Sequence, residues 1–124
     1  MVWEWISLLI FFYKGIDIMT DRKDILNDLK EHLQKNYGDS VKDIILFGSQ
    51  ASDNVIEGSD YDILIILEKN YSRKDEDHIL DLCYDIDLKY NILIDAHIIS
   101  SDELSSLRGK QPLFINALNS GIYA

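Results

Sequence analysis

Two carboxylates separated by one residue open an apolar run and are the side chains best suited to chemistry in this chain. They belong to Asp60 and Asp62, with Tyr61 between them. Side chains of a strand alternate between its two faces, so both carboxylates are predicted to point the same way. Like charges held together repel each other unless a cation neutralises them, and a hard cation such as Mg²⁺ prefers oxygen ligands. The pair therefore indicates a site for a divalent cation.

A Gly-Ser dipeptide, Gly48-Ser49, precedes this pair by ten residues. Gly48 allows the backbone to approach a ligand closely. Ser49 supplies a hydroxyl and an N–H group where a short helix is predicted to begin, and helix starts bind phosphate. A cation site beside a phosphate site predicts a nucleoside triphosphate as the ligand.

Apolar runs on either side place these groups. Residues 44–47 precede Gly48, and residues 63–67 follow Asp62. Both runs are short and rich in β-branched or aromatic side chains, which is typical of strands buried on both faces. The glycine turn is therefore predicted to follow one buried strand, and the carboxylate pair is predicted to stand at the beginning of the next.

A third apolar run, residues 92–99, contains Asp95 and His97. A carboxylate inside a buried strand is costly unless it is charge-paired, hydrogen-bonded or bound to a metal. Asp95 is therefore either a third metal ligand or a carboxylate satisfied by the backbone or by an arginine. His97 shares the face of Asp95 and either lines the rim of the site or has a structural role.

Amphipathic helical patterns surround these strands. One is expected to begin with Thr20 or Asp21 as its N-cap and to end at Gly38. A second follows Ser72, which is predicted to be its N-cap with Asp75 as a poor capping-box partner.

The C-terminal part contains shorter elements. Ser100 opens an N-cap cluster before a short helix, and Pro112 suits the first turn of another helix that Gly121 ends. Residues 122–123 are expected to add an edge strand. Because strand and helix patterns alternate along the chain, the predicted fold class is α/β (α+β), a small β-sheet flanked by helices.

Composition excludes several classes of protein. A chain of 124 residues predicts one domain with one core, and a formal net charge of −10 argues against a broad nucleic-acid surface, which would be basic. The single cysteine, Cys83, cannot form an internal disulfide and is expected to be a packed thiol in a reducing, cytoplasmic setting.

The first eighteen residues differ from the rest because large apolar side chains dominate them. We treat residues 1–18 as an N-terminal extension and residues 19–124 as the domain. The extension is shorter than the roughly 20 apolar residues of a membrane span. Three interpretations stay open: translation begins at Met19, the segment docks on the domain or a partner, or it anchors the chain at a membrane surface. Membrane association is the least expected of the three.

The signature of Gly48-Ser49, ten residues and then Asp60-x-Asp62 resembles that of the minimal nucleotidyltransferases of the polymerase-beta-like nucleotidyltransferase superfamily. The resemblance extends from about Asp24 to Tyr123. It implies a small mixed sheet, ATP as the substrate and two Mg²⁺ ions.

The resemblance also implies a role for each candidate residue. Asp60 and Asp62 would bridge the two metal ions, and Asp95 would bind the ion that activates the acceptor hydroxyl. Gly48 and Ser49 would hold the β and γ phosphates. Ser59 belongs with this phosphate-binding group and is expected to shape the turn into the strand.

One segment departs from the resembled pattern. The family shows roughly Arg-Ala-Arg-Gly after Gly-Ser, whereas this chain has Gln50, Ala51, Ser52 and Asp53 there. Both arginines that would help to hold the triphosphate are therefore absent. The basic residues considered as substitutes are Lys69, Arg73, Arg108 and Lys110.

Members that resemble this chain are commonly antitoxins of toxin–antitoxin pairs. The resemblance implies transfer of AMP from ATP to a tyrosine of a partner HEPN-domain ribonuclease toxin, since the chain is predicted to consist of a catalytic core alone. Two alternatives stay open: inhibition of that partner by contact without catalysis, and nucleotidyl transfer to a small molecule.

Overall fold

The computed structural model describes residues 18–52 and 58–124, with side chains described from Arg22 onward. The extension that we expected over residues 1–18 lies outside the described residues, apart from Ile18. None of the helices in the described ranges combines the length and the apolar character that crossing a membrane would require.

A four-stranded sheet forms the centre of the fold, in the order β3-β2-β1-β4. β2 and β3 run parallel, while β1 pairs antiparallel with both β2 and β4. The mixed sheet that we expected is therefore confirmed. The strands are β1 (Val41–Phe47), β2 (Tyr61–Leu67), β3 (Ile94–Ser100) and β4 (Ile122–Tyr123).

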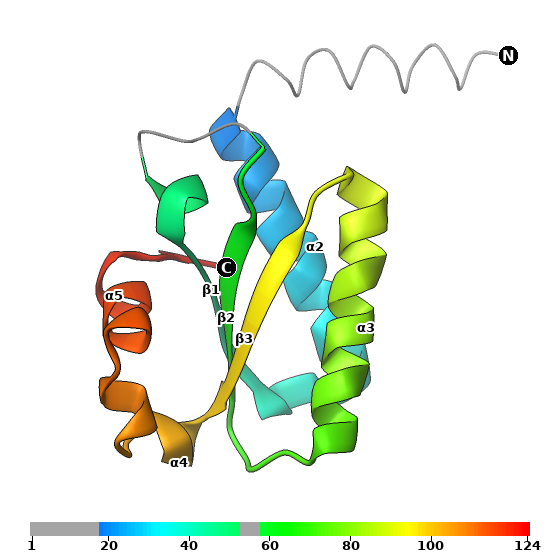
Figure 1. Ribbon diagram of the computed structural model, residues 1–124. Helices are drawn as coiled ribbons and strands as arrows, with labels where there is room; N and C mark the ends of the chain where they lie inside the picture. Colours follow the sequence, from blue (N-terminus) through cyan, green and yellow to red (C-terminus); the bar gives the residue numbers. More distant parts are fainter. Residues whose placement is uncertain (1–17, 53–57) are drawn as a thin grey trace, which may run out of the picture.

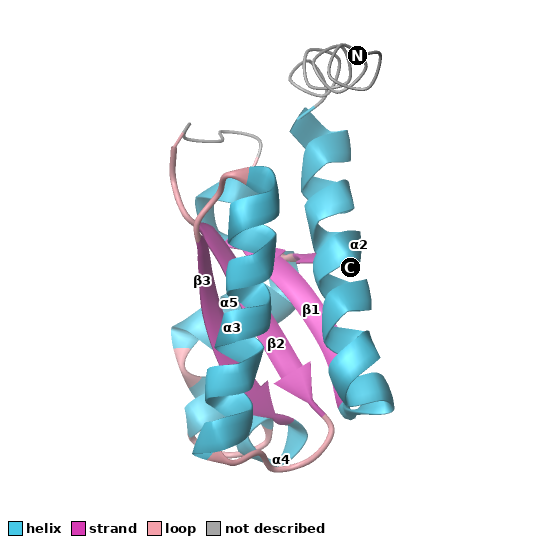
Figure 2. Cartoon of the chain, turned by 90° about the vertical axis from the view of Figure 1, so that its right-hand side faces the viewer, coloured by secondary structure: helices cyan, strands magenta, loops and turns pink. Residues whose placement is uncertain are grey.

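Helices cover both faces of this sheet (Figure 1). The long helices α2 (Ile18–Tyr37) and α3 (Arg73–Tyr90) lie side by side on one face, as Figure 2 also shows. Helix α5 (Pro112–Ser120) lies on the other face, after α4 (Ser101–Leu104). Short 3₁₀ helices form at Gly38–Ser40 (η1), Gly48–Ala51 (η2) and Arg108–Lys110 (η3).

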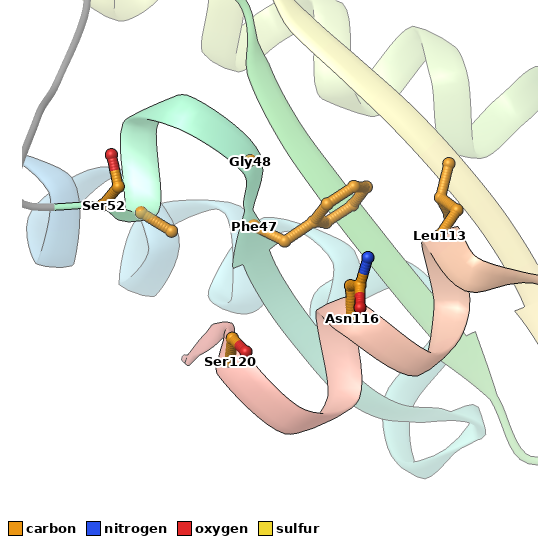
Figure 3. A pocket seen from close by; sticks show the side chains of 7 residues that line it. Phe47, Gly48, Ser52, Leu113, Asn116 and Ser120 are labelled. Atoms are coloured by element: carbon orange, nitrogen blue, oxygen red, sulfur yellow. The ribbon is translucent and has the colours of Figure 1, made fainter.

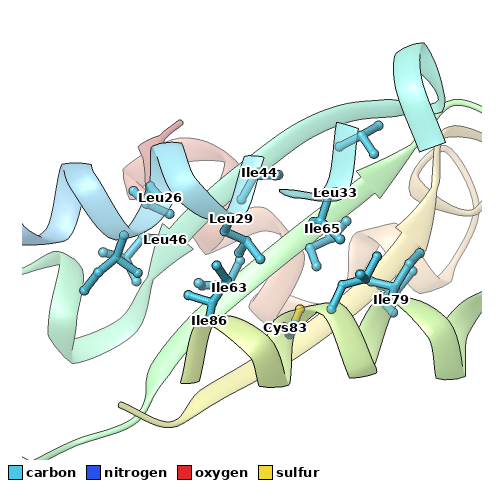
Figure 4. Packing of buried hydrophobic residues seen from close by; sticks show 14 of the residues in the cluster. Leu26, Leu29, Leu33, Ile44, Leu46, Ile63, Ile65, Ile79, Cys83 and Ile86 are labelled. Atoms are coloured by element: carbon cyan, nitrogen blue, oxygen red, sulfur yellow. The ribbon is translucent and has the colours of Figure 1, made fainter. Parts of the chain in front are cut away.

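The larger core lies between the sheet and the two long helices (Figure 4). The alternation of the strands sends every second side chain into it. The spacing of apolar residues at three and four positions along α2 and α3 supplies the facing side. Its central residues are Leu26, Leu29, Leu33, Ile44, Leu46, Ile63, Ile65, Ile79, Cys83 and Ile86.

A second, smaller core lies on the opposite face of the sheet. It comprises Ile45, Leu64, Ile66, Ile99, Phe114 and Ala117. Because alternate residues of β2 enter the two cores, the whole run from Ile63 to Leu67 is buried, as predicted for a strand covered on both faces.

Cys83 is 3 % exposed, and burial raises the pKa of its thiol to about 12. The thiol therefore stays protonated at neutral pH and is unsuited to nucleophilic chemistry. The interpretation of Cys83 as a packed thiol is confirmed.

Two predictions about helix starts were wrong. The helix expected to begin at Thr20 or Asp21 already includes both residues, because α2 begins at Ile18. Asp75 is a full capping-box partner of Ser72, since its carboxylate accepts the Ser72 N–H at 3.0 Å while the Ser72 hydroxyl accepts the Asp75 N–H at 3.1 Å.

Candidate active site

The site begins with two aspartates that the sheet places opposite each other. Asp62 is the second residue of β2, Asp95 is the second residue of β3, and the two are partners in the parallel ladder. Partners on neighbouring strands project from the same face of a sheet. Both carboxylates therefore stand on the face that α5 covers, at the end of the sheet where β2 and β3 begin.

His97 completes a cluster with the two aspartates. One oxygen or nitrogen atom from each of Asp62, Asp95 and His97 lies within 4.8 Å of the others. The His97 Nε2 atom is 3.5 Å from Asp95 Oδ2. The centre of the His97 ring lies 5.6 Å from the centre of the Phe47 ring. The sequence left the role of His97 open, and the structure places it beside the carboxylates.

Asp95 is more exposed than the sequence suggested. The side chain retains 54 % of its accessible surface. The apolar run was taken to begin at residue 92, but β3 begins at Ile94, so Asp95 lies next to the first residue of the strand. The expectation of a carboxylate in the middle of a buried strand was wrong.

Asp60 stands apart from this cluster. It directly precedes β2, is exposed, and is not one of the three residues whose ligand atoms converge. Its negative charge nevertheless helps to raise the pKa of Asp62. The described structure thus brings Asp62 and Asp95 together and leaves Asp60 at the rim.

Charge repulsion is concentrated on Asp62. Burial raises the pKa of its carboxyl above the ordinary value of 3.8, and the neighbouring Asp95 raises this pKa further, while His97 partly opposes the shift. A carboxylate that is both desolvated and next to a like charge favours its neutral form. A bound cation would remove this penalty.

Gly48 allows the loop to approach Asp62. Its φ of +74° lies in the left-handed region, and a Cβ atom built there would be 2.3 Å from Asp62 Oδ2. Glycine is therefore required both by the backbone conformation and by the space. The first residue of η2 consequently lies directly against one of the clustered carboxylates.

Hydrogen bonds join the two ends of the loop that connects β1 and β2. Ser49 Oγ donates to Ser59 Oγ at 2.8 Å. The buried side chain of Gln50 donates through Nε2 to Ser59 Oγ at 2.8 Å and to the Ser59 carbonyl at 3.1 Å. Gln50, which stands where the resembled pattern has an arginine, thus ties the Gly-Ser turn to the residue before Asp60.

Arg22 supports the same turn from α2. Its side chain is 5 % exposed, and its Nη1 donates to the carbonyl of Gln50 and, at 3.4 Å, to that of Ser52. Sequence reasoning missed Arg22, because charged residues of an amphipathic helix usually face solvent and no motif distinguishes this one.

The four basic residues considered as substitutes for the loop arginines belong to segments that follow β2 and β3, at the end of the sheet where these strands end (Figure 1). Arg108 donates to the Ile98 carbonyl at 3.2 Å and to Tyr71 Oη at 3.1 Å, and it pairs with Glu103. It therefore stabilises the fold away from the carboxylates. Lys69 follows the end of β2, Arg73 begins α3 and Lys110 ends η3.

Comparison with known proteins identifies the class of this site. The sequence profile of the nucleotidyltransferase domain family matches residues 26–123. This chain belongs to the nucleotidyltransferase domain family. The matched range includes the Gly-Ser turn, the three aspartates and His97.

Two relatives in Methanocaldococcus jannaschii carry the name "Putative protein adenylyltransferase". One is 36 % identical over 99 residues, which are 80 % of this chain and 89 % of the relative. The other is 34 % identical over 103 residues, which are 79 % of this chain and 69 % of the relative.

The clustered residues fit the divalent metal that nucleotidyltransferases use. Carboxylates are the oxygen ligands that such hard ions prefer, and the carboxylates of Asp62 and Asp95 already converge from neighbouring strands, with His97 beside them. The raised pKa of Asp62 is the electrostatic cost that a cation would relieve. The substrate of this nucleotidyltransferase is a nucleoside triphosphate.

A pocket of about 440 Å³ adjoins the cluster (Figure 3). Phe47, Gly48 and Ser52 line it from the end of β1 and from the turn that follows. Leu113 and Asn116 line it from α5. The pocket and the carboxylates thus share Gly48 as a common boundary.

Replacing Gly48 with alanine is expected to lower the nucleotidyl-transfer rate by about 100-fold. The added Cβ would displace Asp62 by about 1 Å, a misplacement that is costly in an active site. The measurement is the transfer rate, together with the thermal unfolding curve.

The matched control is Gly38→Ala. Gly38 also has a positive φ, of +56°, but an added Cβ would meet no atom within 4 Å. Both variants should lose about 1 kcal/mol of stability through backbone strain, and only Gly48→Ala should lose activity. A wild-type rate in Gly48→Ala would contradict this account of the turn.

Proposed function

We propose that this nucleotidyltransferase transfers AMP from ATP to a tyrosine hydroxyl of a partner protein. The partner is a HEPN-domain ribonuclease toxin, and the transfer silences it, so this chain acts as a cytoplasmic antitoxin. The observation that carries the proposal is the apposition of Asp62 and Asp95 beside the Gly48 turn. The names of the two relatives support protein adenylylation.

The chemistry requires positioning and charge neutralisation more than covalent help from the protein. Bound Mg²⁺ ions would supply the positive charge that stabilises the phosphoryl oxygens and the acceptor oxygen. Asp60 and Asp62 would hold both ions, and Asp95 would hold the ion on the acceptor side.

The Gly48–Ser49 backbone would orient the β and γ phosphates. The tyrosine oxygen forms a bond to the α-phosphorus, and the bond from this phosphorus to the bridging oxygen of the β phosphate breaks. Pyrophosphate leaves with that oxygen, and the hydroxyl proton is released to solvent.

An exposed apolar surface on α3 supports a protein as the acceptor. Leu80, Tyr84 and Leu88 repeat at intervals of four residues, so they share one side of the helix. They are 42 %, 58 % and 66 % exposed. Leu93, 58 % exposed, lies just before β3, two residues before Asp95. The carboxylates stand on the opposite face of the sheet from α3, so a partner docked on the α3 surface would reach them around the edge strand β3.

The charge of the same helix indicates the chemistry of that partner. Asp77 and Asp81 are exposed beside the α3 surface, and Asp85 is bonded to His32 at 2.8 Å. An apolar surface with acidic neighbours complements a partner that presents apolar side chains flanked by lysine or arginine. An RNA-cleaving protein has such basic residues, because it must bind phosphates.

The proposed function is tested by the intact mass of a HEPN-domain partner protein, after incubation with the chain, ATP and Mg²⁺. The wild type should add whole AMP units to the partner. Asp62→Asn and Asp95→Asn should add none, because each removes one of the apposed charges. The control variant is Asp39→Asn, which should modify the partner as the wild type does. Asp39 is an exposed carboxylate in η1, at the far end of the sheet.

An unmodified partner that is nevertheless inhibited in a stable complex would contradict the proposal. It would establish inhibition by contact alone.

The α3 surface is tested with Leu88→Glu in the same assay. We expect the initial rate of partner modification to fall at least tenfold, because a charge replaces a central apolar contact. Leu107→Glu is the matched control, since Leu107 is 82 % exposed but lies between α4 and η3, away from α3. Equal rates for the two variants would show that the partner docks elsewhere.

A further inference from the structure

We propose that the pocket between η2 and α5 is the nucleobase subsite of the ATP site, and that Asn116 is the residue that reads adenine. This inference rests on the proposed function, because it takes ATP as the nucleotide. It adds a binding surface and a specificity residue that the signature motif does not contain.

The position of the pocket suits a nucleotide whose phosphates face the carboxylates. Phe47 lines the pocket and is also the register partner of Asp62 on the neighbouring strand. Gly48 also lines the pocket, and it lies so close to Asp62 that a Cβ atom built on it would meet the Asp62 carboxylate. A nucleoside held in the pocket would therefore extend its phosphates past the Gly-Ser turn toward Asp62 and Asp95.

The lining suits a flat, uncharged group. Phe47 contributes an apolar side chain from the end of β1 and Leu113 contributes one from α5, while Ser52 and Ser120 contribute hydroxyl groups. None of the described residues that line the pocket is charged. A nucleobase and ribose match this chemistry, whereas a triphosphate does not. The volume of about 440 Å³ lies within the usual range for small-molecule sites.

Asn116 is the residue in this lining that can distinguish bases. Figure 3 shows its side chain pointing from α5 toward Phe47. Asn116 is exposed, and its side-chain amide makes no hydrogen bond within the part of the chain that the structure describes. An amide offers a donor and an acceptor side by side, and adenine presents an amino donor beside a ring-nitrogen acceptor. The two groups can therefore form a bidentate pair.

Asn116→Asp tests the assignment because it changes hydrogen bonding with little change in shape. A carboxylate cannot donate to the ring nitrogen of adenine, but it can accept both N–H groups of the guanine edge. We expect ATP affinity to fall about tenfold and the ratio of GTP affinity to ATP affinity to rise by more than that. The measurement is displacement of a fluorescent N-methylanthraniloyl-ATP probe by ATP or GTP, with Mg²⁺ and without acceptor protein.

Asn119→Asp is the matched control. It makes the same chemical change at another exposed position of α5, but Asn119 does not line the pocket. This variant should keep the wild-type affinity for both nucleotides. A change of equal size in both variants would overturn the assignment, because a general effect of negative charge on α5 would then explain it.

Two further outcomes separate this inference from the proposed function. If AMP transfer proceeds and the nucleotide preference of Asn116→Asp equals that of the wild type, the subsite is wrong while the proposed function stands. If the wild type neither binds ATP nor transfers AMP, the proposed function fails and the subsite fails with it.

Discussion

The close approach of two negative charges, on Asp62 and Asp95, is the constraint on which the rest of this structure depends. The parallel register of β2 and β3 fixes these residues opposite each other, so neither can move away without disturbing the sheet. The burial of Asp62 adds to the repulsion. Such an arrangement persists because the apolar packing of the sheet outweighs its cost.

The two faces of the sheet have different roles: one holds the larger core, and the other carries the carboxylates of the site. On one face, α2 and α3 bury the larger core and hold the strands in register. On the other face, the smaller core lies under α5, and the carboxylates stand on that same face where β2 and β3 begin. Arg22 extends from α2 to the carbonyls of the Gly-Ser turn, so the long helix also helps to position the loop.

Much of this arrangement could be predicted from the sequence because it depends on local patterns. The apolar runs predicted the three main strands, and the four-residue periodicity predicted the two long helices. The spacing of Gly48 and Asp62 predicted that the glycine turn and the start of β2 lie close together, while Asp60 stays outside the cluster. These features follow from alternation, helical periodicity and the conformational freedom of glycine.

The rest could not be predicted because it depends on contacts between distant segments. Arg22 and Gln50 are 28 residues apart, and nothing in either segment indicates their hydrogen bond. The exposure of Asp95 depends on where β3 begins, which a continuous apolar run does not fix. The pocket at Asn116 forms only when α5 packs beside the end of β1.

One measurement tests the repulsion between Asp62 and Asp95 most directly. It compares the unfolding free energy of the wild type with that of Asp62→Asn as a function of pH, with and without Mg²⁺. The folded-state pKa of Asp62 is raised above 3.8, so the folded chain binds this proton more tightly than the unfolded chain. Without Mg²⁺, the wild type should therefore lose stability relative to the variant as pH rises through that folded-state pKa. The loss should be at most about 1 kcal/mol at this partly exposed site.

Added Mg²⁺ should restore the wild type and leave Asp62→Asn largely unchanged. A pH-independent difference, or equal stabilisation of both proteins by Mg²⁺, would contradict the account.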